Sequence, residues 1–170
     1  MAAPDDIEAR VRADIAEHGW HVVKVVGDDA APAWAYTIGL TETAGHPELA
    51  MFGLPLDDLH AALNHMGALI RAGRVFEPGE HEGVFEGMPC TVRSVEPRWI
   101  DVFFGNAAWH YKDAAVSLRQ CFWPDAAGRF PWQEEFDASW RDDQPQLFRD
   151  AVEEALSDTL AETLRREGAL

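Results

Sequence analysis

The sequence predicts an α+β fold, in which a mostly antiparallel sheet or partly closed barrel is packed by two long helices. β-type segments follow one another through short turns in the middle of the chain, which favours antiparallel pairing over βαβ repetition. Two long segments have the apolar spacing of amphipathic helices. With 170 residues, of which 47% are hydrophobic, the chain is large enough for one domain with a hydrophobic core.

The first part of the chain predicts one helix and two strands. Apolar residues four positions apart predict a helix over residues 5–18, which Gly19 ends. Residues 20–26 are rich in β-branched side chains and predict a strand. Residues 33–40 alternate bulky and small side chains. This alternation predicts a strand with one small face, which a ligand or another backbone can approach closely.

The middle of the chain predicts a long helix among several strands. Residues 48–54 are apolar on both faces, as expected of an interior strand. An apolar stripe that begins at Pro55 and ends before Gly73 predicts a helix over residues 55–72. Further strands are predicted at residues 84–85, 90–95, 100–104 and 116–123, and a short helix at residues 106–115. The total is roughly six or seven strands.

Residues 1–136 are expected to form a single α+β domain. Residues 137–170 are expected to form an acidic linker and an amphipathic helix that packs on the same domain. This helix is predicted to run over residues 146–167 without interruption. Its apolar stripe suits a homodimer interface as well as a core, so a homodimer stays an open alternative.

The charge of the chain argues against two classes of partner. Thirty acidic and fourteen basic residues give a net charge of -16. Because no basic patch is visible, we expect no nucleic-acid binding and no attraction to anionic membranes. No segment approaches the roughly 20 apolar residues of a membrane span, and no signal peptide is recognisable. We therefore expect a cytoplasmic protein whose two cysteines, Cys90 and Cys121, are reduced.

The segment from Trp34 to Leu49 has the composition of a loop that presents a ligand from a rigid strand. Thr37 offers a hydroxyl group, and His46 offers an imidazole with a pKa near neutrality. Together with the neighbouring Tyr36, they suit a phosphate or carboxylate that is held by hydrogen bonds. The alternative is a hairpin-like connection whose polar side chains satisfy its own backbone. The glycine signatures of nucleotide-binding loops are missing from the sequence.

The segment from Trp123 to Trp132 is a second candidate. Asp125 is expected to accept hydrogen bonds from the amides of a turn, in which Gly128 takes a positive φ. The turn would bring the surrounding aromatic rings together and place Arg129 among them, where it could grip a carboxylate or phosphate. The alternative is an aromatic cluster that only braces the loop.

The seven histidines do not form a recognisable metal site. His60 and His65 are five residues apart, about 140° round a helix, so they do not share a face. Neither a zinc-protease motif nor a paired cysteine motif is found, and no metal is predicted. No activated serine or cysteine nucleophile stands out either. His46 is the best acid/base candidate, and His110 is added as a ligand-binding candidate.

Several short motifs occur in an order that resembles a known family. They are His18-Gly19-Trp20, Tyr36-Thr37-Ile38-Gly39-Leu40, His46-Pro47-Glu48-Leu49, Phe52-Gly53-Leu54-Pro55, Gln120, Trp123-Pro124-Asp125 and Gly128-Arg129-Phe130-Pro131-Trp132. Between about Ile15 and Phe136 the chain resembles the bacterial family called domain of unknown function 4262. The resemblance implies a compact domain and assigns no activity or cofactor. Cys121-Phe122 departs from the aliphatic residues expected there, so no role for this thiol is implied.

The leading hypothesis is a domain of bacterial metabolism or regulation that binds a small polar or anionic ligand between the two loops. The predicted ligand-binding residues are Tyr36, Thr37, His46, His110, Trp123 and Arg129. One alternative is an enzyme, flavin-dependent or hydrolytic, on a barrel-like sheet. Another is a protein-interaction domain that uses its acidic surface to hold a basic partner.

Overall fold

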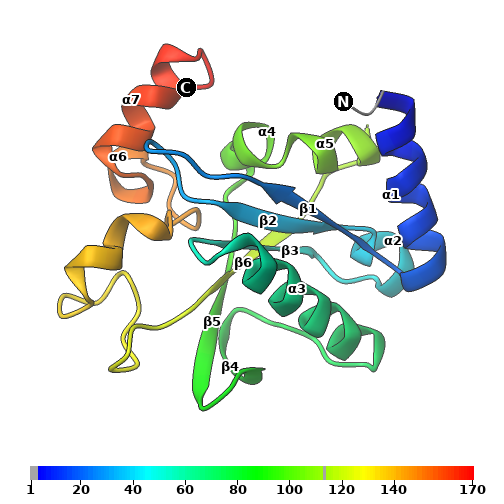
Figure 1. Cartoon of the computed structure of the whole chain (residues 1–170), viewed down its shortest axis with the longest axis horizontal. Helices are drawn as coiled ribbons and strands as arrows, with labels where there is room; N and C mark the ends of the chain where they lie inside the picture. Colours follow the sequence, from blue (N-terminus) through cyan, green and yellow to red (C-terminus); the bar gives the residue numbers. More distant parts are fainter. Residues whose placement is uncertain (1–3, 113) are drawn as a thin grey trace.

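The structure is a computed structural model that describes residues 4–112 and 114–170, and it is built on one six-stranded sheet (Figure 1). The strands lie in the order β1-β2-β3-β6-β5-β4. The central pair, β3 and β6, is parallel, and the other neighbouring pairs are antiparallel. The predicted α+β class with a mostly antiparallel sheet is confirmed. The sheet is open, with β1 and β4 at its two edges, so the closed-barrel alternative is wrong.

The strands have the following bounds: β1 His21–Val25, β2 Trp34–Ile38, β3 Glu48–Phe52, β4 Gly79–Phe85, β5 Met88–Ser94 and β6 Leu118–Phe122. Five of them match predicted strands to within a few residues. β4 is longer than the predicted strand at residues 84–85, because its first half has few of the β-branched and aromatic residues that mark strands. All five residues of β3 are buried, as an interior strand requires.

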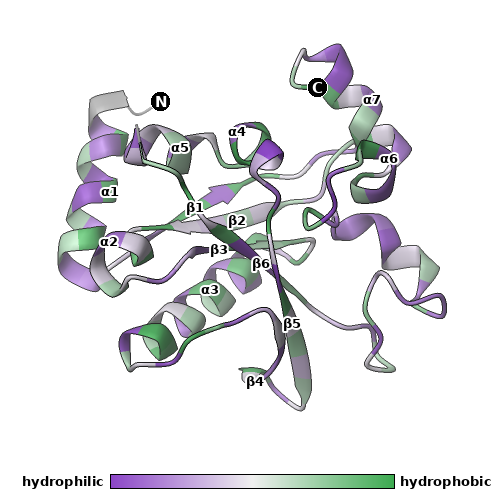
Figure 2. Cartoon of the chain, turned by 180° about the vertical axis from the view of Figure 1, so that it is seen from behind, coloured by the Kyte–Doolittle hydropathy of each residue, from purple (hydrophilic) through white to green (hydrophobic). Residues whose placement is uncertain are grey.

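The helices have the following bounds: α1 Pro4–His18, α2 Leu40–Ala44, α3 Leu56–Arg71, α4 Ile100–Phe103, α5 Gly105–Tyr111, α6 Val152–Ala155 and α7 Asp158–Arg166, with 3₁₀ turns at Pro97–Trp99 and Ala138–Asp143. Within the described residues, no helix has the length and apolar character needed to cross a bilayer. In Figure 2 α1 is drawn mostly in the hydrophilic colours, in keeping with a helix that lies at the surface.

Helices cover both faces of the sheet. On one face lies α3, which buries Leu59, Leu63 and Met66 completely. On the other face lie α1, α4, α5 and α7, whose apolar residues join a second core cluster around Trp99 and Phe104. Burial of a large apolar side chain contributes roughly 1.5–3 kcal/mol, so the two clusters hold the three layers together.

Two predicted elements differ from the structure. The segment predicted as a strand at residues 100–104 contains α4 instead, because Pro97 starts a 3₁₀ turn that continues directly into this helix. A short apolar run has the same pattern in a buried helix as in a buried strand. The helix predicted at residues 146–167 is replaced by two short helices: residues 146–151 are not helical, and α6 and α7 are separated at Leu156, which is extended. Ser157 caps the new helix by accepting a hydrogen bond from the amide of Leu160.

Candidate functional site

The two predicted loops lie at opposite ends of the sheet. His46 precedes β3, whereas Trp123 and Arg129 follow β6. β3 and β6 run parallel, with Glu48 opposite Leu118, so the start of one strand and the end of the other are separated by the length of the strand. Five residues of strand span roughly 17 Å. The expectation that the two loops frame one shared hollow is therefore wrong.

A buried carboxylate, that of Glu48, organises the first loop. Its Oε1 accepts hydrogen bonds from the Thr37 hydroxyl at 2.9 Å and the Leu40 amide at 3.1 Å. Its Oε2 accepts from the amide of Thr41 at 3.0 Å and its hydroxyl at 2.7 Å. The Tyr111 hydroxyl donates to the same oxygen at 2.6 Å, and burial together with this nearby charge raises the pKa of the phenol. Five donors saturate the carboxylate, so it holds the β2–α2 turn together.

His46 is also engaged by the protein itself. The side chain is 4% exposed, its Nδ1 lies 2.7 Å from the Pro47 carbonyl oxygen, and its Nε2 accepts a hydrogen bond from the Phe76 amide at 3.0 Å. Because an amide can only donate, the neutral ring carries its proton on Nδ1. Burial lowers the pKa of this imidazole and outweighs the opposing effect of the Pro47 carbonyl. Both nitrogens are occupied, which leaves no free atom for a ligand.

We expect the protonation of His46 to make the protein less stable in acid. Since its folded pKa lies below the unfolded value of about 6.5, the unfolded chain binds the proton more readily. The stabilising contribution is therefore complete above about pH 6.5 and is lost as the pH falls through the folded pKa. Equilibrium unfolding as a function of pH measures this contribution, and His46→Gln should show a shallower decline between neutral and mildly acidic pH. Equal slopes for the two proteins would contradict it.

The other two predicted residues of this end, Tyr36 and His110, are held by different partners. The Tyr36 hydroxyl accepts a hydrogen bond from the Asn106 amide at 3.3 Å, and burial raises the pKa of this phenol to about 12. His110 is held by Glu42, with Nε2 2.6 Å from Oε1. Its ring lines a smaller cavity beside α1 and α5.

At the other end of the sheet, Asp125 behaves as predicted. Its carboxylate accepts hydrogen bonds from the amides of Ala127, Arg129 and Asp137, and Gly128 has a φ of 81°. Burial by itself raises the pKa of Asp125, but the three amides and the Arg129 guanidinium outweigh it, so the net pKa lies below the usual range. The turn is therefore fixed by its own polar groups.

Arg129 does not lie among the aromatic rings as expected. It pairs with two carboxylates instead, at 3.3 Å from Asp125 and 3.3 Å from Glu135. The cations that do lie over aromatic rings in this region include Arg93, which is 4.6 Å from the Trp132 centroid. The side chain of Trp123 is also engaged within the protein, because its indole N–H donates a hydrogen bond to the Phe52 carbonyl oxygen of β3 at 2.7 Å. The six predicted residues do not surround one cavity, and their role in ligand binding stays a prediction.

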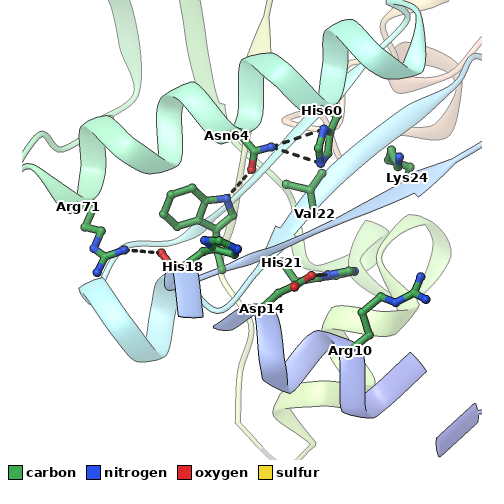
Figure 3. Close-up of a pocket in the computed structure, with 10 residues that line it drawn as sticks. Arg10, Asp14, His18, His21, Val22, Lys24, His60, Asn64 and Arg71 are labelled. Carbon is green, nitrogen blue, oxygen red and sulfur yellow. Dashed lines mark hydrogen bonds and ion pairs between the residues drawn. The ribbon is translucent and has the colours of Figure 1, made fainter. Parts of the chain in front are cut away.

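A more open site lies along the outer edge of β1, between α1 and α3 (Figure 3). This edge-strand pocket has a volume of about 500 Å³. Its walls come from α1 (Arg10, Asp14 and His18), the following turn (Trp20), β1 (His21, Val22 and Lys24) and α3 (His60, Asn64 and Arg71). The pocket is thus assembled from segments about one third of the chain apart, none of which is unusual by itself.

The indole of Trp20 sets the shape of the pocket. It lies against Gly67 of α3, where a Cβ atom would be only 2.6 Å from Cε2. Its Nε1 donates to the Asn64 side-chain oxygen at 2.9 Å. This bond fixes the amide so that its nitrogen points to His60, 3.2 Å from Nε2 (Figure 3). Arg71 donates to the His18 carbonyl oxygen at 2.9 Å and ties the end of α3 to the end of α1.

The pocket is cationic although the protein is strongly acidic. Arg10 and Lys24 have no ion-pair partner within the described part of the chain. The one acidic residue in the walls, Asp14, lies 2.7 Å from His21 Nδ1. This contact engages Nδ1 and leaves His21 Nε2 available for a hydrogen bond to a ligand. The lining of the pocket is therefore chemically suited to a negatively charged group.

Sequence reasoning missed this pocket for a clear reason. His18 and His21 flank Gly19, so they are separated by a chain reversal, and their spacing matches no motif. His60 and His65 indeed point apart, since His65 bonds to a carbonyl of β4. The available signal was the clustering of basic residues near positions 10–24 in an acidic chain. These residues form a pocket only together with α3, whose position beside them the local sequence does not show.

Within residues 4–112 and 114–170, no three His, Cys, Asp or Glu side chains converge in a way that could hold a metal ion. Cys90 and Cys121 are buried free thiols. An open sheet with helices on both faces and a cationic pocket at one edge defines an α+β domain with an accessible polar site.

Comparison with known proteins assigns the chain to a family. The model of the family described as "Domain of unknown function (DUF4262)" matches residues 14–137, and the chain belongs to this family. The match includes all residues of the edge-strand pocket except Arg10. Neither the curated proteins nor the solved structures contain a significant match to the chain.

Proposed function

We propose that this protein binds a small anion, through a carboxylate or phosphate group, in the edge-strand pocket. One observation carries the proposal. The chain has thirty acidic and fourteen basic residues, yet the pocket is lined by three Lys or Arg side chains, three His side chains and one acidic side chain. The pocket is thus lined mainly by basic side chains, whereas the chain as a whole is acidic. This local excess of basic groups favours an anionic ligand in the pocket.

The arrangement of the cations supports this proposal. Arg10 and Lys24 approach the pocket from two different elements, α1 and β1, and neither forms an ion pair with a carboxylate among the described residues. Concentrating like charges is unfavourable in the empty protein, and a bound anion would relieve the repulsion. The histidines can add hydrogen bonds to a carboxylate or phosphate oxygen. The surrounding acidic surface would weaken the binding of large polyanions, which favours a small ligand over a nucleic acid.

We expect Lys24→Gln and Arg10→Gln each to weaken anion binding by roughly tenfold, because a charge-assisted hydrogen bond contributes about 1.5–3 kcal/mol and the lower end applies to these exposed side chains. Isothermal titration with inorganic phosphate, at constant ionic strength, measures the affinity. Arg12→Gln is the matched control, because Arg12 lies on the same helix as Arg10 and pairs with Glu8 outside the pocket. If all three variants bind phosphate as the unmodified protein does, or if the protein binds no anion, the proposal is wrong.

A further inference from the structure

A second cavity adjoins the edge-strand pocket and differs from it in character. It lies between α1, β1 and α5 and has a volume of about 250 Å³. We call it the apolar pocket, after the apolar side chains Ile7, Val11, Val23, Ile38 and Trp109 in its walls. Ile7 and Trp109 are 49% and 50% exposed, among the most exposed large apolar residues described.

The two pockets meet at β1. Arg10, His21, Val22 and Lys24 belong to the walls of both. Successive side chains of a strand point to opposite faces, and Val22 and Val23 belong to the core clusters of the two different faces. Because β1 is an edge strand that pairs only with β2, its outer side is not covered by another strand. A ligand can therefore extend from one pocket to the other around this edge.

The paired pockets fit a molecule with two unlike ends. The edge-strand pocket offers Arg10 and Lys24, which form no ion pair in the part of the chain that the structure describes, and the apolar pocket offers half-exposed apolar side chains. Covering Trp109 and Ile7 with an apolar group would add favourable burial to the attraction of the charges. The shared position of Arg10 and Lys24 places the charged end of such a molecule directly beside its apolar end.

We propose that the ligand of the edge-strand pocket is an amphipathic anion, such as a carboxylate with an attached alkyl chain or ring. The charged group lies beside Arg10 and Lys24, and the apolar part lies against Trp109 and Ile7. This inference rests on the proposed function, because it requires that the anion site exists. At roughly 30 Å³ for a group the size of a water molecule, the apolar pocket holds about eight such groups, so the chain is of medium length.

The test is a titration of the whole protein with acetate, butanoate, hexanoate, octanoate and decanoate at constant ionic strength. We expect the affinity to rise about two- to fourfold for each added methylene and to level off once the apolar pocket is full. Trp109→Ala should flatten this rise. Lys24→Gln should weaken the longer carboxylates by one common factor and leave the rise per methylene unchanged.

Two controls keep the test decisive. Trp140→Ala removes another exposed tryptophan far along the chain, outside both pockets, and should leave the rise intact. Ile7→Ser changes the apolar pocket from α1 and should also reduce the gain in affinity per methylene. This second variant keeps the test valid if Trp109→Ala disturbs the fold. Far-UV and near-UV circular dichroism check that each variant is folded.

The outcomes separate the two proposals. If phosphate and acetate bind but affinity does not rise with chain length, the amphipathic ligand is wrong and the anion site stands. If the affinity still rises with chain length in both Trp109→Ala and Ile7→Ser, the placement of the ligand's apolar part in the apolar pocket is wrong. If sedimentation shows a dimer that Trp109→Ala dissociates, a second copy covers these residues and the inference fails. If neither phosphate nor any carboxylate binds, the proposed function itself fails.

Discussion

Glu48→Ala is expected to lower the free energy of unfolding by about 3–5 kcal/mol, because it leaves the buried amide of Leu40, at roughly 1–3 kcal/mol, and the partly buried amide of Thr41 without an acceptor. The amides of Leu40 and Thr41 are directed at the carboxylate and have no alternative carbonyl partner in the turn that they form. Loss of packing at a position that is completely buried adds to the effect. Chemical denaturation followed by circular dichroism measures the change.

Glu48→Gln distinguishes hydrogen bonding from packing, since the shape of the side chain is kept. Each carboxylate oxygen accepts one backbone amide, from Leu40 at Oε1 and from Thr41 at Oε2. Whichever way the glutamine amide turns, its own N–H groups face one of these donors. We therefore expect a loss of about 1–3 kcal/mol even for this conservative change. Glu86→Gln, in the exposed β4–β5 turn, is the control and should stay within about 0.5 kcal/mol. Equal stability of the Glu48 and Glu86 variants would contradict this role for the carboxylate.

Gly67→Ala is expected to destabilise the protein by about 1–3 kcal/mol, although alanine favours helices by up to about 1 kcal/mol over glycine. The added Cβ atom would lie 2.6 Å from Cε2 and 2.7 Å from Cζ2 of the Trp20 indole, which is rigid and cannot turn away without losing its bond to Asn64. Displacement of the indole would also distort the edge-strand pocket. We therefore expect weaker phosphate binding in this variant as well as lower stability.

A double-mutant cycle identifies the cause of this change. Because Trp20→Ala removes the obstacle, Gly67→Ala should become neutral or stabilising in that background. Gly105→Ala is a matched control, since a Cβ atom at Gly105 meets nothing within 4 Å and this glycine begins α5. Thermal unfolding of the four proteins of the cycle and of the control provides the comparison. If Gly67→Ala destabilises equally with and without the indole, the contact with Trp20 is not the reason.

The same residues explain why helix and strand positions were predictable while the site was not. Alternation over residues 33–40 and the stripe of α3 are local patterns, so they identify β2 and α3 without knowledge of their neighbours. Gly67 and Trp20 are 47 positions apart, and nothing in either neighbourhood shows that one requires the other. The local pattern predicts only an apolar strand around Glu48, because the five donors that bond to its buried carboxylate come from other segments.

By itself, the sequence determined the α+β class, the position of most strands, the local turn at Asp125 and the membership of the family. These properties follow from short-range periodicity, turn chemistry and motif order. The tertiary structure decided where the candidate site lies. The parallel pairing of β3 with β6 sends the two conspicuous loops to opposite ends, and the edge position of β1 gathers Arg10, Lys24 and α3 around one pocket. Strand pairing joins residues distant in the chain, and no local pattern encodes it.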